Sequence, residues 1–371
     1  MIPVCTPLLG KKEERYLRDC IRTNWISSSG KYIKLFEEAF SQYCGTKYGV
    51  TTTNGTTALH LALAALNIGP GDEVIMPSFT IASTAFAVMY CGARPVFVDS
   101  ESDTWNINPD KIQIKITQKT KAILPVHIYG HPCDMSAIMK LANRYGLSVI
   151  EDAAESHGAQ YRGKKVGGIG HIGCFSFYGN KIITCCEGGM VVTNNQTIAN
   201  RCRRLKNMAF IETKRFWHEE IGFNYRMTNV QAALGLAQFE KIEELLKKRR
   251  QNAARYSTLL LGVEGLTLPV ERPDVKNSYW MYGILVGKDF GVSRNALIER
   301  LREKGIETRT FFIPLHNQPF LKKKGLASKE RFPIAEDIAR RGLYLPSGSG
   351  LKRKEIEYVC DCIKQIRDGA R

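Results

Sequence analysis

Short apolar runs alternate with longer amphipathic stretches over residues 47–194. The short runs are rich in Val, Ile and Phe, as strands are, whereas the stretches between them repeat apolar residues every three or four positions, as helices do. This alternation is typical of a mostly parallel sheet with helices on both faces. The expected strands are 47–54, 73–78, 94–99, 121–130, 147–154, 173–179 and 189–194, and the expected helices are 56–66, 80–90 and 135–145.

The pattern changes after residue 227. Residues 229–260 form one long amphipathic stretch, which predicts a single helix connecting two units. The strand 279–286, the helix 293–305, the strand 306–312 and the helix 353–368 then predict a compact α+β unit. We therefore expect a large α/β domain with an N-terminal arm at 1–235, and a connecting helix with a small C-terminal α+β domain at 236–371.

Composition places the chain among ordinary soluble proteins. Of its 371 residues, 44% are hydrophobic and 24% are charged, and no run of apolar residues is long enough to span a membrane. The first residues lack the pattern of a secretion signal. The 11 cysteines include no C-x-x-C pair, so we expect free thiols, no metal site and a cytoplasmic protein.

The formal net charge of +17 calls for an acidic partner. The densest basic runs, 247–250, 322–324 and 352–354, are scattered along the chain and show no pattern of a nucleic-acid-binding motif. Solvated helix faces explain such runs equally well. The charge therefore favours a small phosphorylated ligand over nucleic acid.

One glycine motif is misleading. Gly168, Gly170 and Gly173 have the spacing of a dinucleotide-binding fingerprint, which requires a strand before it and a helix after it. A predicted strand follows here instead. We interpret these residues as loop glycines.

A second glycine motif is better placed for binding an anion. Gly55 follows a predicted strand and opens a predicted helix, whose first amides would point toward a phosphate group. Helix capping by Asn54, Thr56 or Thr57 is the alternative interpretation.

Two further features lie near the same predicted sheet edge. Glu151 and Asp152 end an apolar strand, where α/β proteins bind ligands, and either acid could instead be structural. Lys181 lies between a strand and a glycine turn, where a lone lysine is usually solvated. Together, a lysine, an acid and a phosphate site are what pyridoxal phosphate (PLP) requires: an imine, a partner for the pyridinium nitrogen and an anchor.

These residues belong to a longer set of matching segments. The chain resembles the DegT-type family of sugar-nucleotide aminotransferases, which are fold type I PLP enzymes, over nearly its whole length. Within that family, FSFYGNK and RTFFIPLH resemble the perosamine synthases most. The matching segments are WISSSGKYIKLFEEAF, TNGTTALHLAL, GDEVIMPSFTIAST, ARPVFVD, VHIYGHPCDM, VIEDAAESHGA, GCFSFYGNKIITCCEGGMVVT, GFNYRMTNVQAALG and FFIPLHNQP.

The resemblance implies roles for the reacting groups. Lys181 matches the lysine that forms the imine with the cofactor and later moves protons. Asp152 matches the partner of the pyridinium nitrogen, and Glu155 matches a polar residue near the cofactor hydroxyl. Lysine also favours transamination, because a related 3-dehydratase has histidine at this position.

Further positions match contacts to the cofactor. The amides of Thr56 and Thr57, after Gly55, and the hydroxyl of Ser176 match phosphate contacts. Phe79 matches an aromatic residue stacked on the cofactor ring, although a phenylalanine there could equally be part of the core.

The resemblance also implies a homodimer with shared active sites. Asn224 matches a residue that reaches the cofactor phosphate of the neighbouring subunit, although it could simply be a turn residue. Trp25, Ser27 and His316 match positions near the sugar nucleotide, and for each a core or capping role is a comparable alternative. Cys186 departs from the family, since a smaller residue is usual before the EGG turn.

The implied reaction transfers an amino group from glutamate to C4 of GDP-4-keto-6-deoxymannose, giving GDP-perosamine. Two alternatives remain open. A 4-aminotransferase acting on dTDP-4-keto-6-deoxyglucose would differ only in its nucleotide pocket. A non-catalytic regulatory protein on the same fold would not need the lysine, the acid and the phosphate loop together.

Overall fold

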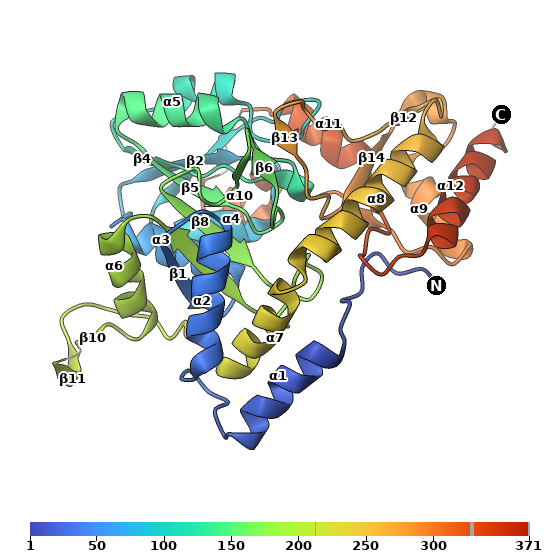
Figure 1. Cartoon of the computed structure of the whole chain (residues 1–371). Helices are drawn as coiled ribbons and strands as arrows, with labels where there is room; N and C mark the ends of the chain where they lie inside the picture. Colours follow the sequence, from blue (N-terminus) through green and yellow to red (C-terminus); the bar gives the residue numbers. More distant parts are fainter. Residues whose placement is uncertain (212, 327–329, 370–371) are drawn as a thin grey trace.

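The computed structural model describes residues 1–211, 213–326 and 330–369. A seven-stranded sheet forms the centre of a large unit, and a four-stranded sheet forms the centre of a smaller one (Figure 1). The diagonal helix α8 (Ile242–Leu260) runs from the first unit to the second. The boundary predicted between residues 235 and 236 falls inside α7 (Asn229–Phe239).

The large sheet has the order β1-β9-β8-β5-β4-β2-β3. The pairs from β8 to β3 are parallel, whereas β9 pairs antiparallel with both β1 and β8. The prediction of a mixed, mostly parallel sheet is therefore confirmed. Its strands are β1 (Tyr48–Thr52), β2 (Glu73–Pro77), β3 (Arg94–Val98), β4 (Thr120–Ile123), β5 (Ser148–Asp152), β8 (Ile172–Ser176) and β9 (Gly189–Thr193).

Apolar residues on both faces explain why this sheet is fully covered. Every residue of β2 is buried, and Val74 and Met76 belong to one core cluster whereas Ile75 belongs to another. Successive side chains of a strand point to opposite faces, so each face needs its own cover. The helix α3 (Gly55–Ala65) contributes to the first cluster and α5 (Met135–Tyr145) to the second.

Other helices and short elements complete the large unit. No element was predicted before residue 47, yet the structure has two helices there, α1 and α2, which pack against α7. The helices are α1 (Lys11–Arg22), α2 (Lys31–Tyr43), α4 (Ala82–Tyr90) and α6 (Gln196–Lys206), with 3-10 turns η1 (Pro109–Lys111), η2 (Gln113–Lys115) and η3 (Ile128–Gly130). The remaining strands are β6 (Gln160–Tyr161), β7 (Lys164–Lys165), β10 (Phe210–Ile211), β11 (Lys214–His218) and β13 (Val275–Lys276).

The prediction of one continuous helix over 229–260 is wrong. The chain leaves the helical conformation at Lys241, where φ is −119° and ψ is 16°, so that α7 and α8 are separate. Contacts with the N-terminal segment fix this break. Glu240 forms an ion pair with Lys12 at 2.8 Å, and the Lys241 amine donates to the carbonyl of Leu8 at 2.8 Å.

The smaller unit has an antiparallel sheet of order β12-β14-β16-β15. The strand predicted at 306–312 is much shorter than expected, because only β15 (Arg309–Thr310) pairs with its neighbour. The other elements are β12 (Leu266–Thr267), β14 (Tyr282–Val286), β16 (Gly342–Leu345), η4 (Lys288–Phe290), η5 (Leu315–Asn317), α9 (Arg294–Glu303), α10 (Pro319–Lys323), α11 (Pro333–Arg341) and α12 (Arg353–Asp368).

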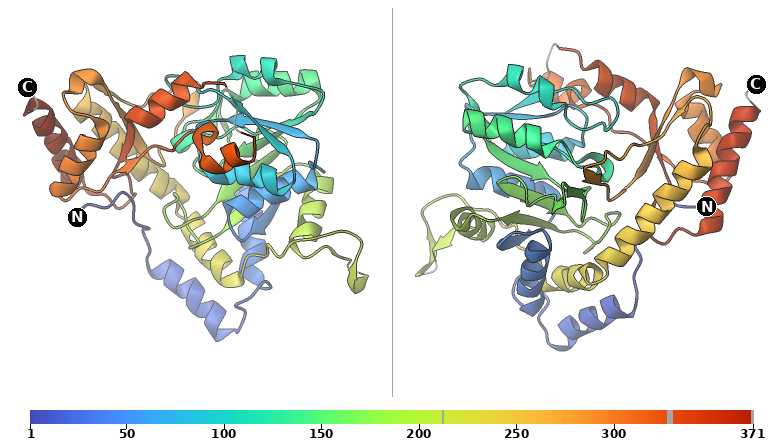
Figure 2. Two further views of the ribbon diagram at one scale, coloured as in Figure 1. Left: turned by 180° about the vertical axis from the view of Figure 1, so that it is seen from behind. Right: turned by 45° about the horizontal axis from the view of Figure 1, so that its top comes forward.

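The N-terminal residues lie against this smaller unit. Ile2 forms a parallel bridge with Ile306, and Ser347 donates its amide to the carbonyl of Val4 at 2.8 Å. The N-terminal residues therefore lie at the same end of the molecule as the C-terminal helix α12 (Figure 2). Within the described residues, no helix combines the length and the apolar character that crossing a membrane would require.

An aromatic cluster joins α2 to the large sheet. The ring of Phe40 is fully buried, and its centroid lies 4.8 Å from that of Phe175, 5.2 Å from Phe177 and 5.8 Å from Phe239. The edge-to-face geometry adds to the energy of burial. This cluster holds β8, and hence the segment that follows it, against α2.

Replacing Phe40 by alanine should therefore destabilise the protein strongly. We expect the free energy of unfolding to fall by about 3–5 kcal/mol, because the substitution removes apolar contacts and leaves a cavity. Urea denaturation measures this change. Leu35→Ala is the control, since Leu35 lies on the same helix and is exposed; equal losses in both variants would contradict the role of the cluster.

Candidate active site

A cavity of about 450 Å³ lies at the carboxyl edge of the large sheet. The strands β5 and β8 end there and α3 begins there, and the smaller unit closes part of the wall. Its lining includes a lysine, three acids and several aromatic rings. The lining residues are Asn54, Gly55, Thr56, Leu59, Ile81, Ser83, Val126, Asp152, Ala154, Glu155, Ser176, Tyr178, Asn180, Lys181, Glu187, Trp280, Phe312 and Tyr344.

The beginning of α3 forms one side of this cavity. Gly55 approaches Ser176 so closely that an added Cβ would lie 2.7 Å from the Ser176 Cβ, so that only glycine fits. Asn54 caps the helix by accepting a hydrogen bond from the Thr57 amide at 2.9 Å. The structure thus brings Gly55, Thr56 and Ser176 to the cavity, whereas the Thr57 amide is engaged in the cap and Thr57 does not line the cavity.

Asp152 ends β5 and is 2% exposed. Its Oδ2 accepts a hydrogen bond from the Thr84 hydroxyl at 3.0 Å, and its Oδ1 accepts one from the Ala154 amide at 3.2 Å. Burial raises the pKa of Asp152, and these two donors and the nearby Lys181 partly oppose that effect. The carboxylate is therefore held in one orientation at the cavity wall.

Glu151, the other acid at this strand end, has a different environment. It is fully buried, and its two oxygens accept hydrogen bonds from the amides of Gly167, Ile169 and Gly170 at 2.6–2.8 Å. His127 Nε2 lies 3.0 Å from Oε2. Of the two acids at this strand end, Asp152 is therefore the one that lines the cavity and can contact a ligand there.

Lys181 follows β8 in a loop that several hydrogen bonds close. Its amide donates to the Tyr178 carbonyl at 2.9 Å. The amide of Phe177 donates to the Gly188 carbonyl, and the amide of Cys185 donates to the Phe177 carbonyl. Burial lowers the pKa of the Lys181 amine, and the carboxylates of Glu155 and Asp152 oppose this shift. The neutral amine, which can accept a proton, is therefore favoured more than in an exposed lysine.

Glu155 is the second carboxyl group beside this amine and is 3% exposed. Its Oε2 accepts a hydrogen bond from the Tyr129 amide at 2.8 Å. Burial raises the pKa of Glu155 to about 7, although Lys181 and the Tyr129 amide act in the opposite direction. The cavity thus holds one amine and two acids whose ionisation depends on burial and on one another.

Two predicted residues, Phe79 and His316, are buried but do not line the cavity. Phe79 is fully buried, and its ring centroid lies 6.2 Å from that of Phe312, which does line the cavity. His316 is also buried, with Nδ1 2.6 Å from the Ser78 hydroxyl and Nε2 3.3 Å from Glu336. Burial lowers the pKa of His316, opposed by Glu336.

Three predicted residues lie away from the cavity. Trp25 and Ser27 are exposed between α1 and α2, and both use their carbonyl oxygens to bind Asn229. Asn224 accepts a hydrogen bond from the guanidinium of Arg226 at 3.0 Å and pairs with Asn207. Within one chain, these residues do not meet Lys181.

Sequence reasoning missed several residues of the cavity. Trp280, Phe312 and Tyr344 come from the smaller unit, and no local pattern links them to Lys181. Thr84, which orients Asp152, lies in a predicted helix without any distinguishing signal. Predicting such long-range contacts requires knowledge of how the two units pack.

The two unusual loop features have structural explanations. Cys186 adopts φ of +69°, a conformation that favours glycine, and donates its amide to the Thr184 hydroxyl at 3.0 Å. Gly168 and Gly170 precede β8, and Gly173 lies within it, so that a strand follows the glycine motif. A dinucleotide-binding turn would lead into a helix.

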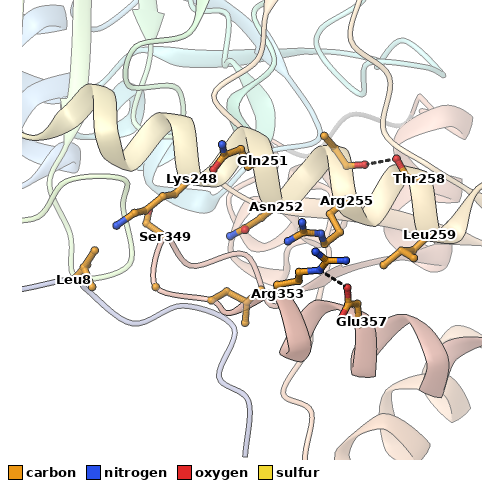
Figure 3. Close-up of a pocket in the computed structure, with 13 residues that line it drawn as sticks. Leu8, Lys248, Gln251, Asn252, Arg255, Thr258, Leu259, Ser349, Arg353 and Glu357 are labelled. Atoms are coloured by element: carbon orange, nitrogen blue, oxygen red, sulfur yellow. Dashed lines mark hydrogen bonds and ion pairs between the residues drawn. The ribbon is translucent and has the colours of Figure 1, made fainter.

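A larger hollow of about 850 Å³ lies between α8 and α12 (Figure 3). None of the predicted site residues lines it. Lys248, Arg255 and Arg353 give it a basic character, but Arg353 is paired with Glu357 at 2.7 Å and Lys248 with Glu244 at 2.7 Å. These side chains form solvated helix faces.

Within the described residues, no group of three or more potential metal ligands is present.

Comparisons with known proteins identify the family of this chain. The model of the DegT/DnrJ/EryC1/StrS aminotransferase family matches residues 7–364. The chain belongs to this family. It is 44% identical to GDP-perosamine synthase of Escherichia coli O157:H7 over 98% of both chains.

Two further comparisons concern Streptomyces proteins. The chain is 37% identical to dTDP-3-amino-3,4,6-trideoxy-alpha-D-glucose transaminase of Streptomyces venezuelae, over 92% of this chain and 89% of the other. The solved structure of S. venezuelae DesV, in complex with a ketimine intermediate, has a TM-score of 0.90 and 36% identity, covering 96% and 94% of the two chains. The family, and with it the fold type predicted from sequence, is thus confirmed.

The raised pKa of Glu155 predicts a pH-dependent contribution to stability. Because the pKa in the folded protein lies above the ordinary value of 4.5, the folded state keeps a proton that the unfolded state loses. That contribution is complete below about pH 4.5 and is lost as the pH rises through about 7. Relative to Glu155→Gln, the wild-type protein should lose up to about 3 kcal/mol of unfolding free energy over this range.

Urea denaturation of the cofactor-free protein at about pH 5 and pH 8 measures this difference. Glu38→Gln is the control, because Glu38 is exposed. If the stability difference between the wild type and Glu155→Gln is the same at both pH values, the raised pKa of Glu155 is contradicted.

Proposed function

We propose that this protein is a PLP-dependent aminotransferase that transfers an amino group from glutamate to C4 of GDP-4-keto-6-deoxymannose, giving GDP-perosamine. The observation that carries the proposal is that Lys181, Asp152 and the Gly55–Ser176 contact, distant in sequence, surround one cavity. The 44% identity to a GDP-perosamine synthase over 98% of both chains supports the choice of substrate.

The residues present fit the cofactor. Gly55 leaves space at the start of α3, where Thr56 and Ser176 would hold a phosphate group. Asp152, held by Thr84, would face the pyridinium nitrogen, and Glu155 would lie near the ring hydroxyl. When bound, the cofactor supplies an electron-withdrawing ring and a carbonyl group that carries nitrogen between the two substrates.

Lys181 is the group that moves protons. Burial favours its neutral amine, which can accept a proton from the carbon of the amino donor and return it later. Asp152 and Glu155 stabilise the protonated form between these two events. Phe312 and Tyr344 line the same cavity and place aromatic surface beside these groups.

The substrate class agrees with the charge of the protein. The net charge of +17 favours a diphosphate-linked sugar. A dTDP-linked 4-keto sugar is the second candidate, because a dTDP-aminosugar transaminase is 37% identical. A non-catalytic role is disfavoured, since the lysine and both acids are present in one cavity.

A substrate panel tests the proposed function. The purified protein, reconstituted with PLP, is incubated with glutamate and with GDP- or dTDP-linked 4-keto-6-deoxy sugars, and the products are identified by mass spectrometry and NMR. We expect an amino sugar from the GDP substrate only, and a fall of at least about 10³-fold in Lys181→Ala because the proton carrier is lost. Lys121→Ala, an exposed lysine, is the control.

Turnover of a dTDP substrate but not of a GDP substrate would overturn the choice of nucleotide. Full activity of Lys181→Ala would overturn the mechanism.

The proposal extends to a cytoplasmic homodimer with shared active sites. Asn224 lies outside the cavity of its own chain, and the hairpin of β10 and β11 projects from the large unit (Figure 1). Trp217 and Ile221 at this projection are 52% and 87% exposed. A second subunit would cover this apolar surface.

The eleven cysteines are free thiols, which supports a reducing compartment.

Active-site complementation tests the shared site. Lys181→Ala and Asn224→Ala each impair every site of their own homodimer. Mixing and re-equilibrating them should restore about a quarter of wild-type activity, because half of the dimers are mixed and each mixed dimer has one intact site. Sedimentation shows whether dimers form. No gain of activity on mixing, with dimers present, would contradict the sharing of sites.

A further inference from the structure

Trp280 contacts Lys181 in two independent ways. The Lys181 Nζ lies 3.7 Å from the centroid of the indole ring. The indole Nε1 donates a hydrogen bond to the carbonyl of Asn180, the residue before Lys181, at 2.9 Å. One side chain therefore contacts both the amine of the lysine and the backbone that presents it.

Trp280 is itself held firmly. It is 4% exposed, and its carbonyl accepts a hydrogen bond from the guanidinium of Arg249. That buried guanidinium also donates to the Ser349 hydroxyl at 3.2 Å and contacts the Cys5 sulfur at 3.2 Å. The sulfur of Cys5 in turn lies 3.5 Å from the Asn180 carbonyl. The indole thus has a fixed position relative to the lysine loop.

The two units meet at this contact. Trp280 precedes β14 of the smaller sheet, whereas Lys181 follows β8 of the large sheet. The indole of Trp280 is thus a point at which the smaller unit contacts the proposed proton carrier. Other aromatic residues of the cavity, Phe312 and Tyr344, have no ring contact of this kind with Lys181 among the described residues.

We propose that Trp280 is a positioning residue for Lys181, whose ring face binds the ammonium form and whose Nε1 fixes the lysine loop, so that the amine stays within reach of Asp152 and Glu155. This inference rests on the proposed function, because Lys181 is the proton carrier in that function and Trp280 is assigned as its partner. Tryptophan is the aromatic side chain that attracts a cation most strongly.

This contact has a chemical consequence. Burial alone favours the neutral amine, and the indole face acts in the opposite direction by stabilising the charged form. The two protonation states are thereby brought closer in free energy. A group that must both accept and return a proton requires this balance.

Acetylation of the cofactor-free protein tests the proposal directly. Acetic anhydride reacts with the neutral amine, so the rate of modification at Lys181 as a function of pH, read by peptide mass spectrometry, gives the pKa of that amine. In Trp280→Leu we expect this pKa to fall by about one unit, equivalent to about tenfold more neutral amine at a given pH. Trp280→Phe should give a smaller fall.

A matched control separates this role from simple packing. Trp105 is also 4% exposed and contacts Tyr129 and Phe311, so Trp105→Phe makes the same change elsewhere in the aromatic core. We expect no change in the acetylation profile of Lys181 in that variant. Trp280→Phe keeps most of the packing volume, and its result decides the question if the leucine variant does not fold.

Kinetics of the reconstituted variants provide a second readout. We expect kcat to fall about tenfold in Trp280→Leu with an unchanged KM for the sugar nucleotide. An unchanged acetylation profile in both Trp280 variants would overturn the proposal even if aminotransferase activity were present. Absence of amino-group transfer to any sugar nucleotide would instead overturn the proposed function, and the acetylation profile would still test Trp280.

Discussion

Burial of the Lys181 amine beside two carboxyl groups is the constraint on which the site depends. An amine in an apolar environment loses hydration, and this favours its neutral form. Asp152 and Glu155 lie in the same cavity and oppose that effect, while their own ionisation is disfavoured by burial. Each group therefore sets the protonation of the others, and none could be removed without changing the rest.

The fold brings these groups together by the geometry of its central sheet. Asp152 ends β5, Ser176 ends the neighbouring β8, and Gly55 begins the helix that packs against β8. Parallel strands direct their carboxyl ends to one edge, so residues far apart in sequence meet there. The aromatic cluster around Phe40 holds β8 in place, and the smaller unit closes the cavity with Trp280, Phe312 and Tyr344.

Much of this arrangement could be predicted from sequence, because its signals are local. The pattern of strands and of the residues near their ends predicted Asp152 and Lys181 as candidate site residues, whereas Ser176 followed only from the family resemblance. The break at Lys241 could not be predicted, since the Lys241 side chain contacts Leu8 and Glu13, which are distant in the sequence. The position of Trp280 was equally hidden, because it lies 100 residues beyond the carbonyl that its indole contacts.

Other predicted residues show where local reasoning ends. Phe79 and His316 were predicted to bind ligands, yet neither side chain lines the cavity, and both contact neighbouring residues instead. Trp25, Ser27 and Asn224 lie away from it within one chain. In the proposed homodimer, a second subunit would have to bring such residues to an active site, and contacts between subunits leave no pattern along a single chain.

The central claim is that Lys181, Asp152 and the start of α3 form one PLP-binding site, in which the cofactor bonds to the Lys181 amine. The most direct measurement is reduction of the reconstituted protein with borohydride, followed by digestion and mass spectrometry. The account predicts a visible absorption band that borohydride abolishes and a single reduced cofactor adduct on the peptide containing Lys181. An adduct on another lysine, or no visible band after reconstitution, would contradict it.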